Sequence, residues 1–277
     1  MKLDRRAFLK SLFTAPALVG LSSSPVLAAI EDKGQGHVKD YITKLKNFNI
    51  PHKEDVILEG RNYKLLRSVV GRIRRLQSLV GYANFAMLSF DDALKYSANY
   101  SSVGMFTKDE IDFLEAVFYR SAKDYGFFGE KVSVNLTDSI ASRDVTKVRG
   151  SGHYLFRGEP LRLYNKIRRD VGRNVVLTSG VRGVVKQMYL FLNKAINSKG
   201  NLSMASRSLA PPGHSFHGVG DFDVGKRGYG YKNFTEDFSR TYEFKRLLDL
   251  GYVRIRYPEN NPFGVRYEPW HIKVVKA

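Results

Sequence analysis

The chain has 277 residues, with 45 Lys and Arg against 27 Asp and Glu, a formal net charge of +18 and no Cys. Its 43% hydrophobic and 13% aromatic content is enough to build a core, which excludes a disordered basic tail. The lack of Cys excludes disulfides, thiolate metal sites and cysteine nucleophiles, so any metal must be held by His, Asp or Glu. The basic excess predicts an anionic partner without identifying its class.

The first 29 residues have the pattern of an export signal. A charged start precedes a short apolar run from Leu12 to Leu21, and small residues follow at Ala28 and Ala29. The run is too short for a membrane anchor. The segment Asp-Arg-Arg-Ala-Phe-Leu-Lys resembles the twin-arginine consensus for export of folded proteins, with an ordinary Sec signal as the alternative. We expect residues 1–29 to be removed and the protein to act in the periplasm.

Removal of this segment would take away four basic residues and one acidic residue and leave a net charge of +15. In the periplasm, nucleic acid is not an expected partner. The anionic candidates are cell-wall polymers and the envelope surface. Export by this route would also make the twin-arginine translocation machinery a partner.

Residues 30–145 are expected to form a mostly helical region. Residues 30–60 are polar and are interpreted as a linker leading into the first element. Residues 61–80 place apolar side chains at helical spacing, with Arg and Lys elsewhere. This pattern predicts an amphipathic helix with a basic outer side, which is more typical of a solvated face than of a binding surface.

Two further helices in this region are indicated by capping patterns. Ser89 with Asp92 and Thr107 with Glu110 each place an acid three residues after a hydroxyl, the pattern that begins helices. Gly126 is expected to end the second of these helices.

Residues 146–277 mix both kinds of element. The spacing of apolar residues predicts helices over 161–170, 184–196 and 235–250, and strands over 174–178, 252–257 and 266–275. We therefore predict three regions, namely residues 1–29, 30–145 and 146–277. The predicted fold class is α+β, with a small antiparallel sheet and flanking helices preceded by the mostly helical region.

Two segments in the last quarter place His beside carboxylates. A hydrolytic zinc site takes three protein ligands and keeps a fourth position for water. His217 and Asp223 lie across a Gly-rich turn and can supply two ligands, and His271 can supply the third. Glu268 is then available as a base that is not bound to the metal. Taken alone, each cluster is also compatible with a structural His and a turn Asp.

These residues stand within four motifs whose order resembles the zinc D-alanyl-D-alanine carboxypeptidases of the VanY type, in the LAS group of peptidoglycan peptidases. Residues 30–140 show no such resemblance. The motifs are Thr178-Ser-Gly-Val-Arg182 with Gln187, Pro211-Pro-Gly-His-Ser-Phe-His217 followed by Asp223, Leu250-Gly-Tyr-Val-Arg-Ile-Arg-Tyr-Pro258, and Tyr267-Glu-Pro-Trp-His271.

The resemblance implies a metal site in a fold of the LAS or hedgehog type. His217, Asp223 and His271 would hold one Zn²⁺ per chain, and Glu268 would be the catalytic base. The family usually places six residues between the first His and the Asp, whereas five separate His217 from Asp223. A one-residue deletion in the turn would keep Asp223 as the ligand, and Asp221 is the alternative.

The resemblance also implies how the substrate is bound. Arg182 would pair with a substrate carboxylate, and Ser215 and Gln187 would be further substrate-binding residues. The implied activity is zinc-dependent hydrolysis of peptidoglycan stem peptides, with a D-alanyl-D-alanine carboxypeptidase favoured. The alternatives are an endopeptidase of the same fold and a non-hydrolytic, zinc-containing wall-binding module. The motifs leave open carboxypeptidase against endopeptidase and D,D against L,D cleavage.

Overall fold

A computed structural model describes residues 35–275 of the chain, and the predicted twin-arginine signal at residues 1–29 lies outside them. Within the described residues, no helix combines the length and the apolar composition needed to cross a membrane. The α-helices are α2 (Gln35–Lys46), α3 (Gly60–Val80), α4 (Tyr82–Phe85), α5 (Phe90–Asn99), α6 (Lys108–Tyr119), α7 (Glu159–Val171), α8 (Val184–Asn197), α9 (Leu202–Ser206) and α10 (Tyr242–Asp249).

The strands form two small antiparallel sheets. β1 (Val145–Val148) and β2 (His153–Phe156) make a hairpin. β3 (Val175–Ser179), β4 (Phe222–Lys226) and β5 (His271–Ile272) make a three-stranded sheet in the order β3-β4-β5.

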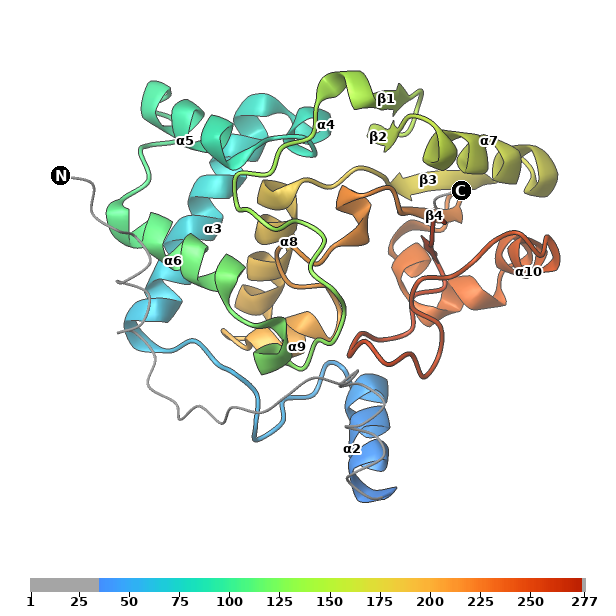
Figure 1. Cartoon of the computed structure of the whole chain (residues 1–277), viewed down its shortest axis with the longest axis horizontal. Helices are drawn as coiled ribbons and strands as arrows, with labels where there is room; N and C mark the ends of the chain where they lie inside the picture. The colour runs from blue at the N-terminus through green and yellow to red at the C-terminus, as the bar shows by residue number, and fades with distance from the viewer. Residues whose placement is uncertain (1–34, 276–277) are drawn as a thin grey trace. The chain divides into compact units, whose positions relative to one another are not determined.

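The predicted amphipathic helix is confirmed as α3. Its buried stripe packs against α5, α6 and α8 in one apolar core (Figure 1). The outer side is basic and exposed, as expected, at Arg61, Lys64, Arg67, Arg74 and Arg75. Two of these side chains form contacts within the protein. Arg61 pairs with Asp109 at 2.6 Å, and Arg75 donates a hydrogen bond to the Val103 carbonyl. The residues of α3 in the core are Leu66, Val69, Val70, Ile73 and Leu76.

Both predicted helix caps are confirmed. The Ser89 hydroxyl accepts a hydrogen bond from the Asp92 amide at the start of α5. Thr107 and Glu110 form a full capping box at the start of α6. The expectation for Gly126 is wrong, because α6 ends at Tyr119. Gly126, with a φ of 80°, ends the following 3-10 turn instead.

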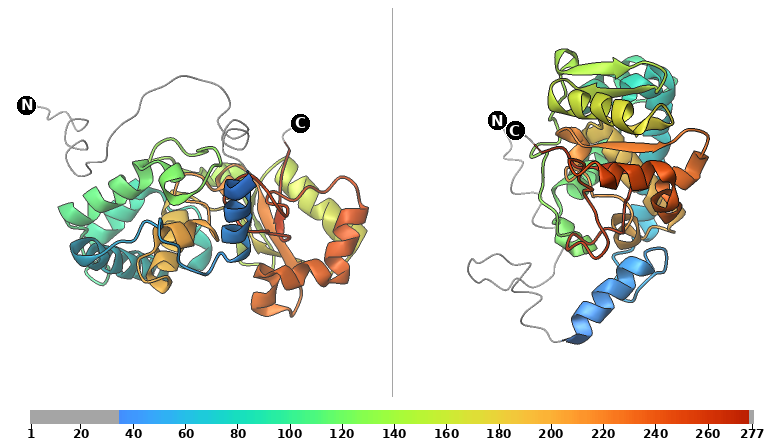
Figure 2. Two further views of the ribbon diagram at one scale, coloured as in Figure 1. Left: turned by 90° about the horizontal axis from the view of Figure 1, so that it is seen from below. Right: turned by 90° about the vertical axis from the view of Figure 1, so that its right-hand side faces the viewer.

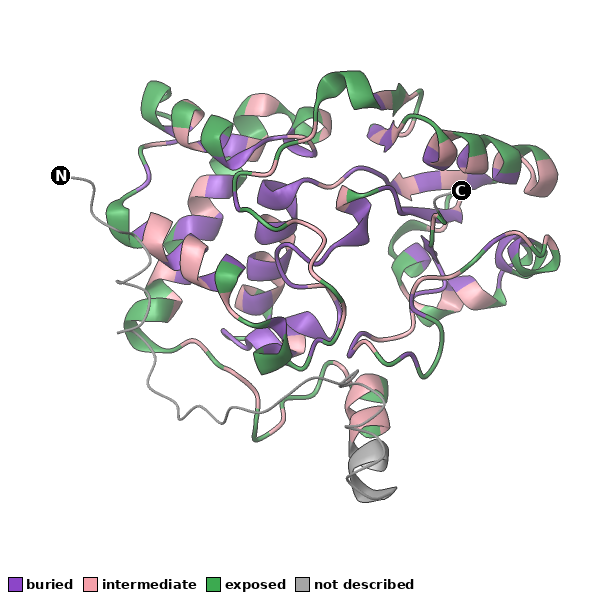
Figure 3. Cartoon of the chain, in the orientation of Figure 1, coloured by how far each residue is buried: buried purple, intermediate pink, exposed green. Residues whose placement is uncertain are grey.

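Helix α8 connects the two halves of the chain. Figure 3 shows more of it buried than exposed, and its buried apolar side chains belong to the same core as those of α3. The core contains residues from both sides of the predicted boundary between residues 145 and 146, since α8 begins at Val184. The boundary itself stays a prediction. The chain passes from β3 of the three-stranded sheet into α8, so α8 links that sheet to the helical core.

A second core lies at the three-stranded sheet. Helices α7 and α10 contact each other and pack beside the sheet (Figure 2), and they contribute Tyr164, Ile167, Phe244 and Leu247 to the second core. The predicted α+β class is therefore confirmed: a small antiparallel sheet with flanking helices follows a mostly helical region.

Four predicted elements differ from the structure, namely the linker, one helix and the two C-terminal strands. The linker expected over 30–60 contains α2. The helix expected over 235–250 is wrong, because Thr235 and Thr241 each cap a separate element with their hydroxyls and only α10 is an α-helix. The two long C-terminal strands are also wrong, since only β5 and an isolated bridge between Ile255 and Ile272 pair.

Candidate active site

The register of the three-stranded sheet determines which site residues lie side by side. Ser179 on β3, Asp223 on β4 and His271 on β5 are Cα partners in one row across the sheet. Partners in such a row project their side chains from the same face. His217 reaches the row from the short 3-10 turn Phe216–Gly218 that precedes β4. The sequence therefore brings three distant segments to one point by strand pairing.

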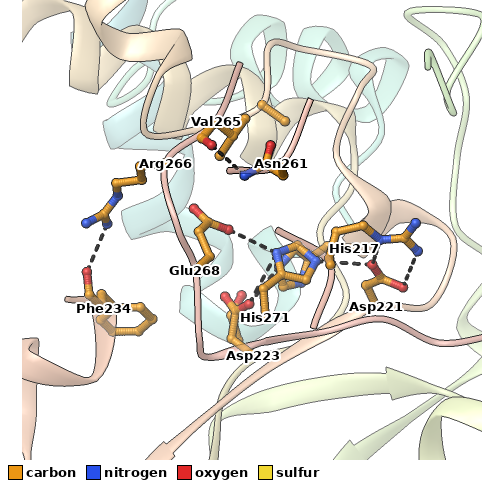
Figure 4. Close-up of polar contacts among 12 residues, drawn as sticks. His217, Asp221, Asp223, Phe234, Asn261, Val265, Arg266, Glu268 and His271 are labelled. Atoms are coloured by element: carbon orange, nitrogen blue, oxygen red, sulfur yellow. Dashed lines mark hydrogen bonds and ion pairs between the residues drawn. The ribbon is translucent and has the colours of Figure 1, made fainter. Parts of the chain in front are cut away.

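His217, Asp223 and His271 lie together, as Figure 4 shows around the His271 ring. Nε2 of His217 is 3.2 Å from Oδ1 of Asp223, and Nδ1 of His271 is 3.7 Å from the same oxygen. The potential ligand atoms all lie within 4.8 Å of one another. The three residues are only 1%, 3% and 4% exposed. Their donor atoms, two imidazole nitrogens and a carboxylate, are those that zinc takes.

The protonation of His217 leaves a lone pair pointing at Asp223. Nδ1 of His217 lies 2.8 Å from the Gly180 carbonyl, which can only accept, so we infer that Nδ1 carries the proton. Burial lowers the pKa of His217 to about 4, so the ring is neutral at pH 7 and its Nε2 is unprotonated.

Asp223 brings a negative charge to the same point. Burial alone would raise its pKa, but the interactions with His217, His271 and Arg182 outweigh burial and lower it to about 2. Neither Oδ1 of Asp223 nor Nε2 of His217 has a hydrogen-bond partner in the part of the chain that the structure describes. A bare imidazole nitrogen facing a carboxylate oxygen is an unfavourable contact that a bound cation would relieve. The residues present therefore fit a divalent metal.

Asp221 lies on the outer side of His271. Its carboxylate receives two hydrogen bonds from Arg256, at 2.6 and 3.0 Å, and one from the Val274 amide at 2.8 Å. It also lies 3.2 Å from Nε2 of His271, which turns Nδ1 of that ring toward Asp223. The structure thus groups Asp223 with the two His residues and leaves Asp221 to orient one of them.

Glu268 lies beside the three residues and is itself buried. Its Oε2 is 3.2 Å from Nδ1 of His271, and its amide donates to the Tyr257 carbonyl at 3.0 Å. Burial alone would lower the pKa of His271, but hydrogen bonds to Asp221 and Glu268 raise it to about 9. A carboxylate next to the site, but outside the group of three, has the position that a proton acceptor needs.

Arg182 lies in the short connection between β3 and α8 and is held by its neighbours. Its Nη2 donates to Ser179 at 3.0 Å and its Nη1 to Gln187 at 3.3 Å. Nη2 is also 3.5 Å from Oδ2 of Asp223. Gln187 in turn donates to the Ala210 carbonyl. Both terminal nitrogens of Arg182 are thus engaged by the protein, and Gln187 serves to orient the guanidinium.

These side chains face a cavity of about 340 Å³. Of the predicted residues, Arg182, Ser215 and Glu268 line it together with the group of three, whereas Gln187 is not among the lining residues. Aromatic rings complete the wall, and three cations that sequence reasoning missed, Lys186, Lys194 and Arg266, also face the cavity. The aromatic lining residues are Tyr82, Phe85, Tyr189, Phe234, Tyr257 and Trp270.

Comparison with known proteins bears on this C-terminal part of the chain. Residues 160–276 match the model of the VanY family, described as D-alanyl-D-alanine carboxypeptidase. The three candidate ligands, Arg182, Ser215 and Glu268 lie within the matched segment, whereas Tyr82 and Phe85 of the cavity wall lie before it. The chain is therefore similar to these carboxypeptidases over its sheet, α7, α8 and α10. A search of the curated proteins finds no match.

Two solved structures show a weaker likeness. The LdcB LD-carboxypeptidase is 26% identical with a TM-score of 0.40, and covers 47% of this chain and 63% of its own. A mutant of the vancomycin resistance D,D-pentapeptidase VanY in complex with Zn(II) is 20% identical with a TM-score of 0.35, and covers 48% and 78%. The likeness thus spans less than two thirds of the first of these chains. Because both TM-scores are below 0.5, the functional inference rests on the family match and the site.

Proposed function

We propose that this protein is a zinc-dependent peptidase that hydrolyses peptidoglycan stem peptides, acting as a D-alanyl-D-alanine carboxypeptidase. The observation that carries the proposal is the pair of buried, unpartnered ligand atoms on His217 and Asp223. They lie beside His271 and Glu268 in a cavity, within a segment that matches the VanY family. The family description supports the substrate class.

The proposal includes one zinc ion per chain. Nε2 of His217, the Asp223 carboxylate and Nδ1 of His271 would hold it, while the hydrogen bond from Nε2 of His271 to Asp221 fixes that ring. A zinc ion held there would supply Lewis-acid activation of the scissile carbonyl and of the attacking water.

The chain's own residues would move the proton and steady the charge. Glu268 would accept the proton of the attacking water on its carboxylate and later deliver it to the departing amine. The Arg182 guanidinium, oriented by Ser179 and Gln187, would stabilise the negative charge that develops on the carbonyl oxygen. Ser215, which lines the cavity, would hydrogen-bond the peptide.

The proposed location of the enzyme is the periplasm, reached through the twin-arginine machinery. The support is the Asp-Arg-Arg-Ala-Phe-Leu-Lys segment near the N-terminus. A periplasmic location would place the enzyme next to its proposed substrate. The exposed basic side chains of α3 and the net positive charge are suited to anionic surroundings in the envelope.

Product analysis tests the proposal. The purified protein should remove one D-alanine from muropeptides that end in D-alanyl-D-alanine, as measured by mass spectrometry. A chelator should abolish the reaction and added zinc restore it. Glu268→Gln should lower kcat about 10³-fold, whereas Glu259→Gln at an exposed position should not. Hydrolysis that survives both the chelator and Glu268→Gln would disprove the proposal, and release of a different fragment would reassign the bond.

A further inference from the structure

Lys186 is a buried cation that the proposed chemistry leaves unused. It is the third residue of α8, and only 4% of its surface is exposed. Its ammonium nitrogen has no hydrogen-bond acceptor within residues 35–275. The nitrogen lies 4.8 Å from the centroid of the Tyr82 ring, so the aromatic face is the contact that this charge makes. A buried lysine with an unpaired ammonium is rare, because desolvation of the charge is costly.

The position of Lys186 connects it to the candidate site. Lys186, Arg182 and Asp223 all line the same cavity. Burial and the positive charge of Arg182 lower the pKa of Lys186 to about 7, and the negative charge of Asp223 acts in the opposite direction. An anion entering the cavity would supply the counter-charge that Lys186 lacks.

Lys186 and Arg182 differ in which of their hydrogen-bond donors remain available to a ligand. Both terminal nitrogens of Arg182 already contact Ser179, Gln187 and Asp223. The three donors of the Lys186 ammonium are free of hydrogen bonds to the described residues. Of these two cations, Lys186 is therefore the one whose terminal nitrogen has no hydrogen-bond partner among the described residues and can bind an anionic group directly, in the cavity where hydrolysis would occur.

We propose that Lys186 binds the free C-terminal carboxylate of the peptide and so makes this enzyme a carboxypeptidase rather than an endopeptidase. The inference rests on the proposed function. The terminal carboxylate of such a substrate is one residue from the scissile bond, so it must lie close to the group that cleaves it. A peptide without this carboxylate leaves the buried ammonium unpaired and is bound less tightly.

Binding to an inactive variant tests the inference without hydrolysis. The probes are diacetyl-L-lysyl-D-alanyl-D-alanine with a free C-terminal carboxylate and the same peptide with a C-terminal amide. The protein is zinc-loaded Glu268→Gln, with or without Lys186→Met. Trp270 is the only Trp of the chain and lines the cavity, so its fluorescence reports binding.

With Lys186 present, the acid should bind about 10- to 100-fold more tightly than the amide. Lys186→Met and Lys186→Gln should each bring the ratio of the two dissociation constants to about threefold or less. Lys245→Met, which removes the same charge from an exposed position on α10, should leave the ratio unchanged. An acid-to-amide ratio that is the same with and without Lys186 would overturn the inference.

Thermal unfolding separates a binding role from a structural one. Since a buried charge without a hydrogen-bond partner is removed, Lys186→Met should raise Tm by about 2 °C or more. A lower Tm would show that Lys186 supports the fold and would overturn the inference. The two proposals also fail separately. If the wild type hydrolyses neither peptide but the binding preference depends on Lys186, only the proposed reaction fails.

Discussion

The helical core around α3 and the cavity beside β4 both bury charged side chains, but they satisfy them differently. In the helical core, the Glu110 carboxylate receives hydrogen bonds from Ser68, Arg72 and the Thr107 amide. Within residues 35–275, twelve buried side-chain atoms lack a hydrogen-bond partner, and eight of them belong to residues that line the cavity. These eight residues are Thr178, Arg182, Lys186, Ser208, His217, Asp223, Tyr257 and Arg266.

This difference indicates that the helical core stabilises the protein and that the cavity binds a ligand. A buried polar group without a partner costs about 1–3 kcal/mol, so a cluster of them is expected only where a ligand completes the contacts. The helical core and the paired groups around it should therefore carry the stability of the protein. Substitutions that remove polar groups from the cavity should lower the free energy of unfolding of the protein only slightly.

The largest effect is expected in the helical core. Phe191 on α8 is fully buried, and its ring centroid lies 5.8 Å from that of Tyr125. Phe191→Ala should lower the free energy of unfolding by about 4 kcal/mol because it opens a cavity. Leu248→Ala, at a half-exposed position on α10, should cost less than about 1 kcal/mol. Urea denaturation measures both, and similar losses would contradict the assignment of stability to the helical core.

A buried ion pair next to the helical core should have the second largest effect. Arg207 donates to both oxygens of Asp55, at 2.7 and 2.9 Å, and both side chains are buried. Asp55→Asn should destabilise by about 3 kcal/mol, since it leaves the guanidinium unpaired. The adjacent Glu54 pairs with Lys44 at the surface, so Glu54→Gln should cost no more than about 0.5 kcal/mol. Equal effects in thermal unfolding would show that the burial of the Asp55 pair is irrelevant.

The same pair predicts a pH dependence. Although burial alone would raise it, hydrogen bonds from Arg207, His52 and Asn201 lower the pKa of Asp55 from 3.8 to about 2. Because the pKa is lower in the folded state, the stabilisation is complete above about pH 4 and is lost as the pH falls through about 2. The stability difference between wild type and Asp55→Asn should shrink over that window. A difference that stays constant from pH 7 to pH 2 would contradict this.

Two tyrosines provide the smallest and most closely matched comparison. The Tyr164 hydroxyl accepts a hydrogen bond from the Leu177 amide at 3.0 Å, whereas the Tyr257 hydroxyl, which faces the cavity, has no partner among the described residues. Tyr164→Phe should cost about 1.5 kcal/mol because it orphans a buried N–H. Tyr257→Phe should change stability by less than about 0.5 kcal/mol. A larger loss from Tyr257→Phe in urea denaturation would weaken the comparison.

Most of the helices could be predicted from local patterns in the sequence. The apolar stripe of α3 and the caps at Ser89 and Thr107 act within one or two turns, so they are readable without tertiary contacts. The helix expected over 235–250 failed because Thr241 also acts as a cap in the middle of the apolar pattern. The strand expected over 266–275 is interrupted by Pro269, which lacks an N–H, whereas the segment 252–257 contains no Pro and pairs only through the bridge at Ile255.

For the site, motif order identified the residues, but strand register was needed to arrange them. His217, Asp223 and His271 are brought together by the β3-β4-β5 pairing, which no local pattern specifies. Lys186 was missed because a single Lys in an apolar helix is usually on the surface. Its apolar neighbours Val184, Val185 and Met188 were the only available sign of its burial.

Zinc binding by the purified wild type and two variants tests the central claim most directly, with bound metal counted after equilibrium dialysis. The wild type should bind one zinc ion, and Asp223→Ala should lose binding because a ligand is removed. Asp221→Asn should still bind one ion, but about 10- to 100-fold more weakly, since it only orients His271. Full zinc binding by Asp223→Ala, or complete loss in Asp221→Asn alone, would contradict the account.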